Sequence, residues 1–231
     1  MSKERIAIIG AGRFGSAIAL ALSQKGVEVL VIDSELSVIQ DISDDVAYAV
    51  CTDATNKRAL QAENIEDFDV VVVAIGNDFQ ASLLCTANLL DLNMKRIICR
   101  TLGKSQQIIL EKMGITEFLF PEDAVGAVVA EKLINPNILS YLQLPDDYKI
   151  AEILTPQRLV GLKLGLIEFR NNYRLSLITI RRLFNKQISG SQEDEEHIIG
   201  VPENTEVIQE KDVFVVFGLA KDIDNFIKIN Q

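Results

Sequence analysis

Short apolar runs alternate with amphipathic stretches through the first 134 residues of this 231-residue chain. Some runs, such as Val70 to Ile75, are apolar at every position, which is typical of strands covered by helices on both faces. The alternation predicts a six-stranded parallel sheet. We expect strands at residues 5–9, 27–32, 46–51, 69–75, 95–100 and 117–120, and helices at residues 13–25, 35–43, 56–62, 78–91, 104–113 and 122–134.

The alternation ends at Asn135 and Pro136. We expect a connecting helix and linker over residues 135–147, with the helix at 138–142, and a smaller α+β domain over residues 148–231. The acidic stretch 192–196 is interpreted as a solvated hairpin loop. The expected β segments of this domain are 149–155, 166–169, 175–180, 206–209 and 213–217, and a helix from 221 to 229 follows them.

The first predicted strand leads directly into a G-x-G-x-x-G turn at the start of a helix. Gly10 permits the tight turn, Gly12 lets the backbone approach a pyrophosphate, and Gly15 lets the helix pack close to the strand. The helix N-terminus offers free N–H groups to phosphates. The next strand ends at Asp33, where a carboxylate accepts hydrogen bonds from ribose hydroxyls. These features predict an α/β, Rossmann-type, doubly wound nucleotide-binding domain over residues 1–134.

Ligands of doubly wound sheets bind at the carboxyl ends of the strands. Asp53, Ala54 and Thr55 follow the third predicted strand and are placed to line an adenine pocket. Gly76 follows the fourth strand, where the missing side chain allows a ligand to approach the backbone closely. Asp53, Thr55 and Asp78 are equally suited to capping the helices that follow, so both roles stay open for them.

Two arginines are candidates for contact with phosphates. Arg13 lies inside the glycine turn at a helix N-terminus, where a cation opposes the helix dipole. Its position is explained if phosphate charge compensates it; the alternative is a side chain that points to solvent. Arg100 ends the fifth predicted strand and reaches either the same crevice or an acidic partner on the surface. Glu122 follows Pro121 at a helix start, where the dipole alone favours an acid.

Composition excludes several classes of function. The formal net charge of −10 argues against nucleic-acid binding, which needs clustered cations. No apolar run reaches the roughly 20 residues that span a bilayer, and the N-terminal residues do not resemble a signal peptide, so we expect a cytoplasmic protein. Cys51, Cys85 and Cys99 are interpreted as reduced, buried thiols, because they lie in apolar segments without a C-x-x-C pair.

Residues that would act on a bound nucleotide are not evident. The chain has one histidine, His197, and it lies in the acidic stretch far from the glycine turn in sequence. A dehydrogenase generally needs an acid/base group beside the substrate. We therefore expect a nucleotide sensor without catalysis. An NAD(P)-dependent oxidoreductase remains the alternative, because Asp33 would bind its adenosine ribose equally well. A redox-sensing repressor would need a basic DNA-binding helix, which the sequence does not supply.

The order of several segments resembles the RCK family, the cytosolic regulatory subunits of bacterial Ktr/Trk potassium uptake systems. The resemblance covers nearly the whole chain and implies a Rossmann-type domain followed by a smaller α+β (RCK C-terminal) domain. It also implies a homodimer that assembles into an octameric ring on the inner face of the membrane, docked on an integral-membrane potassium transporter subunit. The segments that carry it are 9–15, 72–76, 120–122, 137–142, 159–161, 177–182, 212–218 and 222–223.

The resemblance also implies a ligand. Members with the Arg-Phe-Gly form of the turn respond to ATP and ADP, whereas others use NAD or NADH. Arg13 matches the family's phosphate-contacting arginine, and Glu122 matches an acid near the terminal phosphate and its cation, such as Mg²⁺. The expected nucleotide site consists of Gly10, Gly12, Arg13, Phe14, Gly15, Asp33, Ser34, Asp53, Ala54, Thr55, Ile75, Gly76, Asn77, Arg100 and Glu122.

In some relatives the C-terminal domain binds cyclic di-AMP at a dimer interface, and Arg170, Asn171 and Tyr173 fall in the corresponding segment. The sequence departs from the family pattern at Arg174 and Lys211, which stand where glycine is common.

Overall fold

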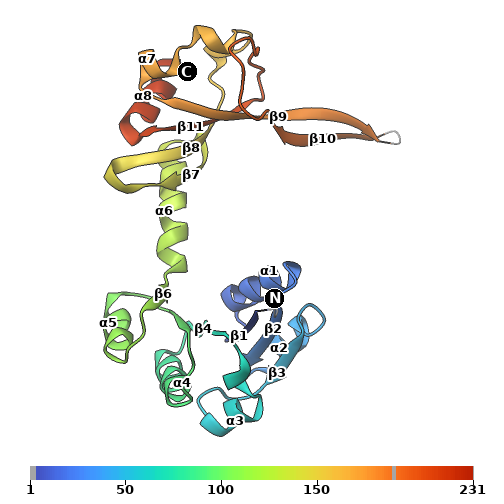
Figure 1. The fold of residues 1–231 in the computed structure, drawn as a ribbon, viewed down its shortest axis with the longest axis vertical. Coiled ribbons are helices and arrows are strands. Elements are labelled where there is room, and N and C mark those ends of the chain that lie inside the picture. The colour runs from blue at the N-terminus through green and yellow to red at the C-terminus, as the bar shows by residue number, and fades with distance from the viewer. Residues whose placement is uncertain (1–3, 189–190, 231) are drawn as a thin grey trace. The chain divides into compact units, whose positions relative to one another are not determined.

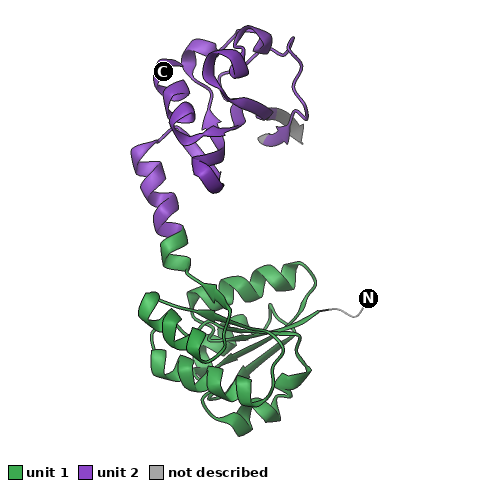
Figure 2. Cartoon of the chain, turned by 60° about the vertical axis from the view of Figure 1, so that its left-hand side comes forward, with its two compact units in different colours: residues 1–124 green, residues 125–231 purple. Residues whose placement is uncertain are grey.

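The computed structural model describes residues 4–188 and 191–230, with side chains at 4–184 and 195–230. The chain divides into two compact units, residues 1–124 and 125–231, which are coloured separately in Figure 2. The division falls inside helix α6 (Pro121–Ile134), earlier than the expected domain end at residue 134. Among the described residues, no helix combines the length and apolar character that crossing a bilayer requires.

Unit 1 is the predicted doubly wound sheet. Its six strands lie in the order β3-β2-β1-β4-β5-β6, all neighbouring pairs are parallel, and helices cover both faces (Figures 1 and 2). The elements are β1 (Arg5–Ile9), α1 (Arg13–Gln24), β2 (Glu28–Asp33), α2 (Leu36–Ile42), β3 (Tyr48–Cys51), α3 (Lys57–Ala62), η1 (Ile65–Asp67), β4 (Val70–Val73), α4 (Phe79–Asp91), β5 (Ile97–Arg100), α5 (Lys104–Lys112) and β6 (Glu117–Leu119), followed by α6.

Alternate residues of the central strands face opposite layers of helices. Ile9 belongs to one buried apolar cluster with Val71 and Val73, while Ile8 belongs to a second cluster with Val70 and Val72. Because side chains of a strand alternate between the two faces of its sheet, both sets need apolar residues. The uninterrupted apolar runs in the sequence are therefore the expected consequence of a sheet that is buried on both sides.

The turn between β1 and α1 depends on its glycines. Gly10 has φ +96°, and a Cβ atom there would lie 2.9 Å from the backbone nitrogen of Ile75. A Cβ atom on Gly15 would overlap the carbonyl oxygen of Gly10. Side chains at these two positions would push α1 away from the carboxyl ends of β1 and β4. The turn thus keeps the N-terminus of α1 at the edge of the sheet.

Unit 2 holds a five-stranded antiparallel sheet in the order β10-β9-β11-β8-β7. Beyond the last pairs that join β9 to β11, β9 and β10 continue as a two-stranded arm (Figure 1). The elements after α6 are β7 (Ile138–Gln143), η2 (Pro145–Asp147), β8 (Tyr148–Leu154), η3 (Gln157–Leu159), η4 (Leu164–Leu166), α7 (Phe169–Tyr173), β9 (Ser176–Ile188), β10 (Ser191–Ile198), β11 (Val213–Leu219) and α8 (Ala220–Asn230).

The expected connecting helix at 138–142 is wrong, since these residues form strand β7. Strand β7 pairs with β8 in a hairpin, so residues 135–147 belong to unit 2 and are not a linker. Ile138 is buried and Tyr141 packs against the same core, while Leu142 is exposed. A short apolar run of this kind fits a helix or a strand equally well by pattern, and here pairing with β8 decides the outcome.

Other details of unit 2 also differ from the expectation. The acidic stretch 192–196 lies in β10, antiparallel to β9, and is not a loop. Pairing with a cationic strand favours this arrangement, as in the ion pair between Arg181 and Glu196 at 2.5 Å. The strand expected at 166–169 falls on η4 and the start of α7. The strand expected at 206–209 is reduced to one bridge between Lys163 and Val207.

The three cysteines do not share one environment. Cys85 and Cys99 are buried as expected, and burial raises the pKa of the Cys85 thiol to about 12. Cys51 is exposed, so the expectation of a buried thiol is wrong there. Strand β3 lies at the edge of the sheet, and Cys51 is its last residue, which explains the exposure.

A buried ion pair fastens the segment between β10 and β11. Arg182 is 7% exposed and Asp212 is 1% exposed. Two guanidinium nitrogens of Arg182 each donate to Asp212 over 2.7 Å, and Nη2 also donates to the carbonyl of Val207. Nη1 of Arg182 pairs with Glu206 at 2.5 Å, and Asp212 accepts a further bond from the Gln209 amide at 2.8 Å. This network satisfies both buried charges.

Replacing Asp212 by alanine should destabilise the protein by about 3–5 kcal/mol, because Arg182 would keep its charge in a buried site without its main partner. Urea unfolding followed by circular dichroism measures the change. Glu196→Ala is the matched control, since it removes one of the two acidic partners of the neighbouring Arg181 and Glu196 is more exposed than Asp212. An equal effect of the two substitutions would contradict the assignment of Asp212 as the structural partner.

Candidate functional site

A cavity of about 880 Å³ lies in unit 1 at the carboxyl ends of the strands. Every residue of the expected nucleotide site lines it except Gly15. Gly15 lies beneath the turn, packed against the Gly10 carbonyl and Ala74. The lining residues are Ile9, Gly10, Gly12, Arg13, Phe14, Ala17, Ile32, Asp33, Ser34, Asp53, Ala54, Thr55, Ala74, Ile75, Gly76, Asn77, Asp78, Ala81, Arg100, Pro121 and Glu122.

Asp33 is held in a fixed orientation at the end of β2. Its Oδ2 accepts the Ala11 amide at 2.7 Å, and its Oδ1 accepts the Glu35 amide at 2.9 Å. Each carboxylate oxygen has a second lone-pair site. Asp33 can therefore accept bonds from a vicinal diol in the cavity while its backbone contacts hold it in place.

Asp53, Thr55 and Asp78, for which both helix capping and ligand contact stayed open, differ from one another in the structure. Asp78 caps α4 by accepting the Ala81 amide at 2.9 Å, yet it also lines the cavity. Asp53 does not cap α3, because Asn56 takes that role. Asp53 instead accepts bonds from both the amide and the hydroxyl of Thr55, which closes a local turn at the cavity wall. Capping and lining are thus not exclusive here.

Arg13 has the environment of an uncompensated cation. It is the first residue of α1, whose first turn contains no acidic residue. Within the described part of the chain, its side chain makes no hydrogen bond and no ion pair. An arginine at a helix N-terminus is disfavoured by the helix dipole. The cavity therefore presents an unpaired guanidinium beside free backbone N–H groups, an arrangement that attracts anions.

Arg100 reaches the cavity and also has an acidic partner, so both expected alternatives hold. Its side chain is 17% exposed and forms an ion pair with Glu122. The guanidinium lies over the ring of Phe14, with 5.4 Å from Cζ to the ring centroid. Its Nε is buried and has no hydrogen-bond partner among the described residues. The pKa of Glu122 lies below its usual value because its own backbone N–H and Arg100 both stabilise the charged carboxylate.

Small residues one turn into the helices were missed by the sequence reasoning. Ala17 of α1 and Ala81 of α4 line the cavity. Each lies three or four residues after a cavity residue at the helix start, on the same helix face, so helical spacing gives a usable signal. Their short side chains leave room between the two helices and the ligand space.

The lining holds the carboxylates of Asp33, Asp53, Asp78 and Glu122, but it contains no histidine, lysine, tyrosine or cysteine. His197 lies on β10 in unit 2, with Nε2 3.6 Å from a carboxylate oxygen of Glu195. In the described part of the chain, no cluster of three or more His, Cys, Asp or Glu side chains is arranged to hold a metal ion. A cation near Glu122 would have to complete its coordination with oxygens from a ligand or from water.

The residues expected to contact cyclic di-AMP lie on α7 in unit 2. Arg170 and Asn171 are exposed, whereas Tyr173 packs edge-on against Phe226 and donates a hydrogen bond to Asn230. Arg174, which stands where relatives often have glycine, has a left-handed backbone with φ 58°. That conformation explains why glycine suits the position. Cyclic di-AMP binding stays a prediction.

Comparison with known proteins places this geometry in a family. Residues 6–121 match the model of the TrkA-N domain. The chain is 32% identical to the Ktr system potassium uptake protein C of Bacillus subtilis (strain 168) over 226 residues, covering 98% of this chain and 97% of the relative. It is 30% identical to the Ktr system potassium uptake protein A of the same organism, covering 98% and 96%.

A solved structure has the same fold across both units. The crystal structure of the GsuK RCK domain aligns with a TM-score of 0.52 and 20% identity, covering 99% of this chain. This chain accounts for 46% of that longer chain. The chain therefore belongs to the TrkA-N domain family that includes the Ktr system potassium uptake proteins A and C.

Proposed function

We propose that this chain is a nucleotide-sensing regulatory subunit of a potassium uptake system, and that the cavity of unit 1 binds ATP or ADP without acting on it. The observation that carries the proposal is the pairing of an oriented ribose acid, Asp33, with an unpaired cation, Arg13, across one cavity. The potassium role is supported by the full-length similarity to Ktr proteins.

The adenosine half of the ligand would lie between β2 and β3. Asp33 would accept the ribose hydroxyls, a contact that disfavours a 2′-phosphate by charge repulsion. The backbone near Ala54 and Thr55 would face the base. The bond from the Asn88 side chain to the Thr55 carbonyl at 2.8 Å supports the shape of this wall. NADP is accordingly a poor candidate.

The phosphate half would lie over the glycine turn. Arg13 supplies a full positive charge in addition to the helix N-terminus, and Arg100 supplies a second. Guanidinium groups bind phosphate oxygens in a bidentate manner. Two arginines suit a chain of phosphates with high charge, which favours ATP or ADP over NAD. Glu122 would hold a cation such as Mg²⁺ at the terminal phosphate, because carboxylate and phosphate oxygens are the ligands that Mg²⁺ prefers.

Assembly of several copies is supported by exposed apolar side chains on three helices. Helix α6 has no buried residue, and Val125, Val129 and Leu133 are each at least 49% exposed. Leu84 of α4 and Ile108 and Ile109 of α5 are exposed as well. Exposed apolar patches often mark protein interfaces. Two kinds of interface can alternate around a closed ring, and we propose the octamer docked on the inner face of a membrane potassium transporter.

In this proposal, ATP and ADP regulate the ring by binding its conformations unequally. A ligand shifts a conformational equilibrium only through such differential affinity. Typical coupling energies are about 1–3 kcal/mol per site, so several identical sites acting together can switch an assembly. An NAD(P)-dependent oxidoreductase is the alternative function. The described lining argues against it, because it offers no histidine, lysine or tyrosine to move a proton, and its four carboxylates already accept hydrogen bonds from backbone amides or from Arg100.

A thermal shift series with ATP, ADP, AMP, adenosine, NAD⁺ and NADH tests the ligand. We expect the unfolding midpoint to rise with ATP and ADP more than with equal concentrations of NAD⁺ or NADH, because the stabilisation of the folded state grows with the logarithm of ligand concentration over Kd. Repeating the series with EDTA and with Mg²⁺ shows how much of each shift in the unfolding midpoint depends on a cation. Stabilisation by NADH without any response to ATP or ADP would contradict the assignment.

Replacing Arg13 by alanine should weaken ATP binding about tenfold or more, since the substitution removes hydrogen bonds to a charged group. Adenosine binding, which does not involve phosphate, should stay nearly unchanged. Isothermal titration calorimetry measures both. Arg58→Ala is the matched control, because Arg58 is an exposed arginine at a helix start outside the cavity. If Arg13→Ala weakened ATP and adenosine equally, Arg13 would not be a phosphate ligand.

A further inference from the structure

Arg100 and Glu122 bring opposite charges together inside the cavity that we assign to phosphates. The ion pair joins the last residue of β5 to the first turn of α6. Glu122 is half exposed and Arg100 is largely buried. The arginine is therefore the fixed partner, and the glutamate is the partner that can leave.

The position of Arg100 is determined by its neighbours. The ring of Phe14 lies on one side of the guanidinium. The backbone of Gly76 lies close on another side, and a Cβ atom at Gly76 would overlap the guanidinium. Because Arg100 is held between two parts of the cavity wall, its charge stays in place whether or not Glu122 remains bound to it. An anionic ligand would meet this charge directly.

Glu122 and a phosphate group have conflicting requirements. Both are anions, and both are attracted to the guanidinium of Arg100 and to the N-terminal N–H groups of α6. Two anions at such close range repel each other unless a cation lies between them. A phosphate that binds Arg100 without a cation must therefore displace the Glu122 carboxylate.

We propose that Arg100 exchanges partners: without ligand it holds Glu122, and a nucleotide phosphate that binds without a cation replaces Glu122 and releases the first turn of α6, whereas a bound cation lets Glu122 stay beside the phosphate. This inference rests on the proposed function, because it requires a phosphate in the cavity. It adds a regulatory step to that site: the negative charge of the ligand breaks the ion pair between Arg100 and Glu122 at the start of α6.

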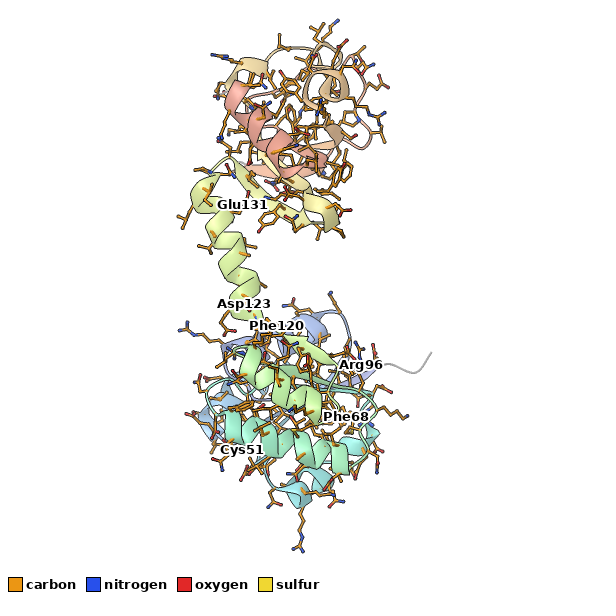
Figure 3. All side chains as sticks on the ribbon, turned by 90° about the vertical axis from the view of Figure 1, so that its left-hand side faces the viewer. Cys51, Phe68, Arg96, Phe120, Asp123 and Glu131 are labelled. Carbon is orange, nitrogen blue, oxygen red and sulfur yellow. The ribbon has the colours of Figure 1, made fainter. Side chains whose placement is uncertain are left out.

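The other end of α6 is fastened separately, within unit 2. Glu131 pairs with the buried Lys149 at 3.0 Å, and Asn135 donates to both Glu131 and Asp224. Figure 3 labels Asp123 and Glu131 on this helix. Release of Glu122 would leave the contacts of Glu131 and Asn135 within unit 2 unchanged.

The exchange is tested by titrating ADP, in EDTA and at low salt, into the wild type, Glu122→Gln, Arg100→Gln and the double variant. Glutamine at position 122 no longer competes as an anion, so ADP should bind about two- to fivefold more tightly, the range expected for an exposed ion pair. Arg100→Gln should weaken ADP binding. In the double variant, most of the increase in ADP affinity that Glu122→Gln causes should disappear. Asp123→Asn is the matched control, because it removes a charge from the same helical turn outside the cavity.

Hydrogen exchange of the Ala124 amide, which donates to the Phe120 carbonyl in the first turn of α6, gives an independent readout. ADP should accelerate exchange in the wild type, whereas Glu122→Gln should exchange rapidly before ADP is added. Two outcomes would refute the exchange while the proposed function stands, provided that the wild type binds ADP. One is that Glu122→Gln still increases ADP affinity when Arg100 is replaced, and the other is that Asp123→Asn increases it equally. If wild type binds neither ADP nor ATP, the proposed function itself fails.

Discussion

The parallel pairing of the strands in unit 1 is the constraint on which the site depends. Because all six strands point the same way, the residues that follow them meet at one edge of the sheet, however far apart they lie in the sequence. Asp33, Arg100 and Glu122 become neighbours of one cavity in this way. The turn at Gly10 then brings the N-terminus of α1 to the same edge. Fold and site are consequences of the same pairing.

The cavity combines two cations with several acids, and the two groups have different environments. The acids beside β2 and β3, Asp33 and Asp53, already accept backbone hydrogen bonds that fix them. Beside α1 and β5, Arg13 lacks a partner among the described residues and Arg100 is shared with Glu122. The positive charge is therefore available to a ligand, whereas the negative charge is largely occupied in holding the wall of the cavity.

The sequence was sufficient to predict unit 1 and most of its cavity. Strands buried on both faces produce uninterrupted apolar runs, and the glycine turn has strict steric requirements, so both features are evident from residue types alone. The partner of Arg100 was not predictable, because it depends on how far a long side chain reaches across the cavity. Ala17 and Ala81 were missed because small residues carry no chemical signal by themselves.

Unit 2 was harder to predict because its strands are short or strongly charged. Strand β7 has too few residues to separate a helical from a β pattern, and its identity comes from pairing with β8. Strand β10 is so acidic that it resembles a loop until its cationic partner on β9 is known. Exposure of Cys51 follows from the place of β3 at the sheet edge, which is a property of strand order and not of local sequence.

The central claim, that nucleotide identity regulates potassium transport through this chain, is tested most directly by flux. Proteoliposomes would hold the membrane subunit of a Ktr-type system together with this chain, and potassium uptake would be measured with ATP, with ADP and without nucleotide. Our account predicts that uptake differs between ATP and ADP, and that the difference disappears when Arg13 is replaced by alanine. Equal uptake with ATP, ADP and no nucleotide, in liposomes where this chain is bound, would contradict it.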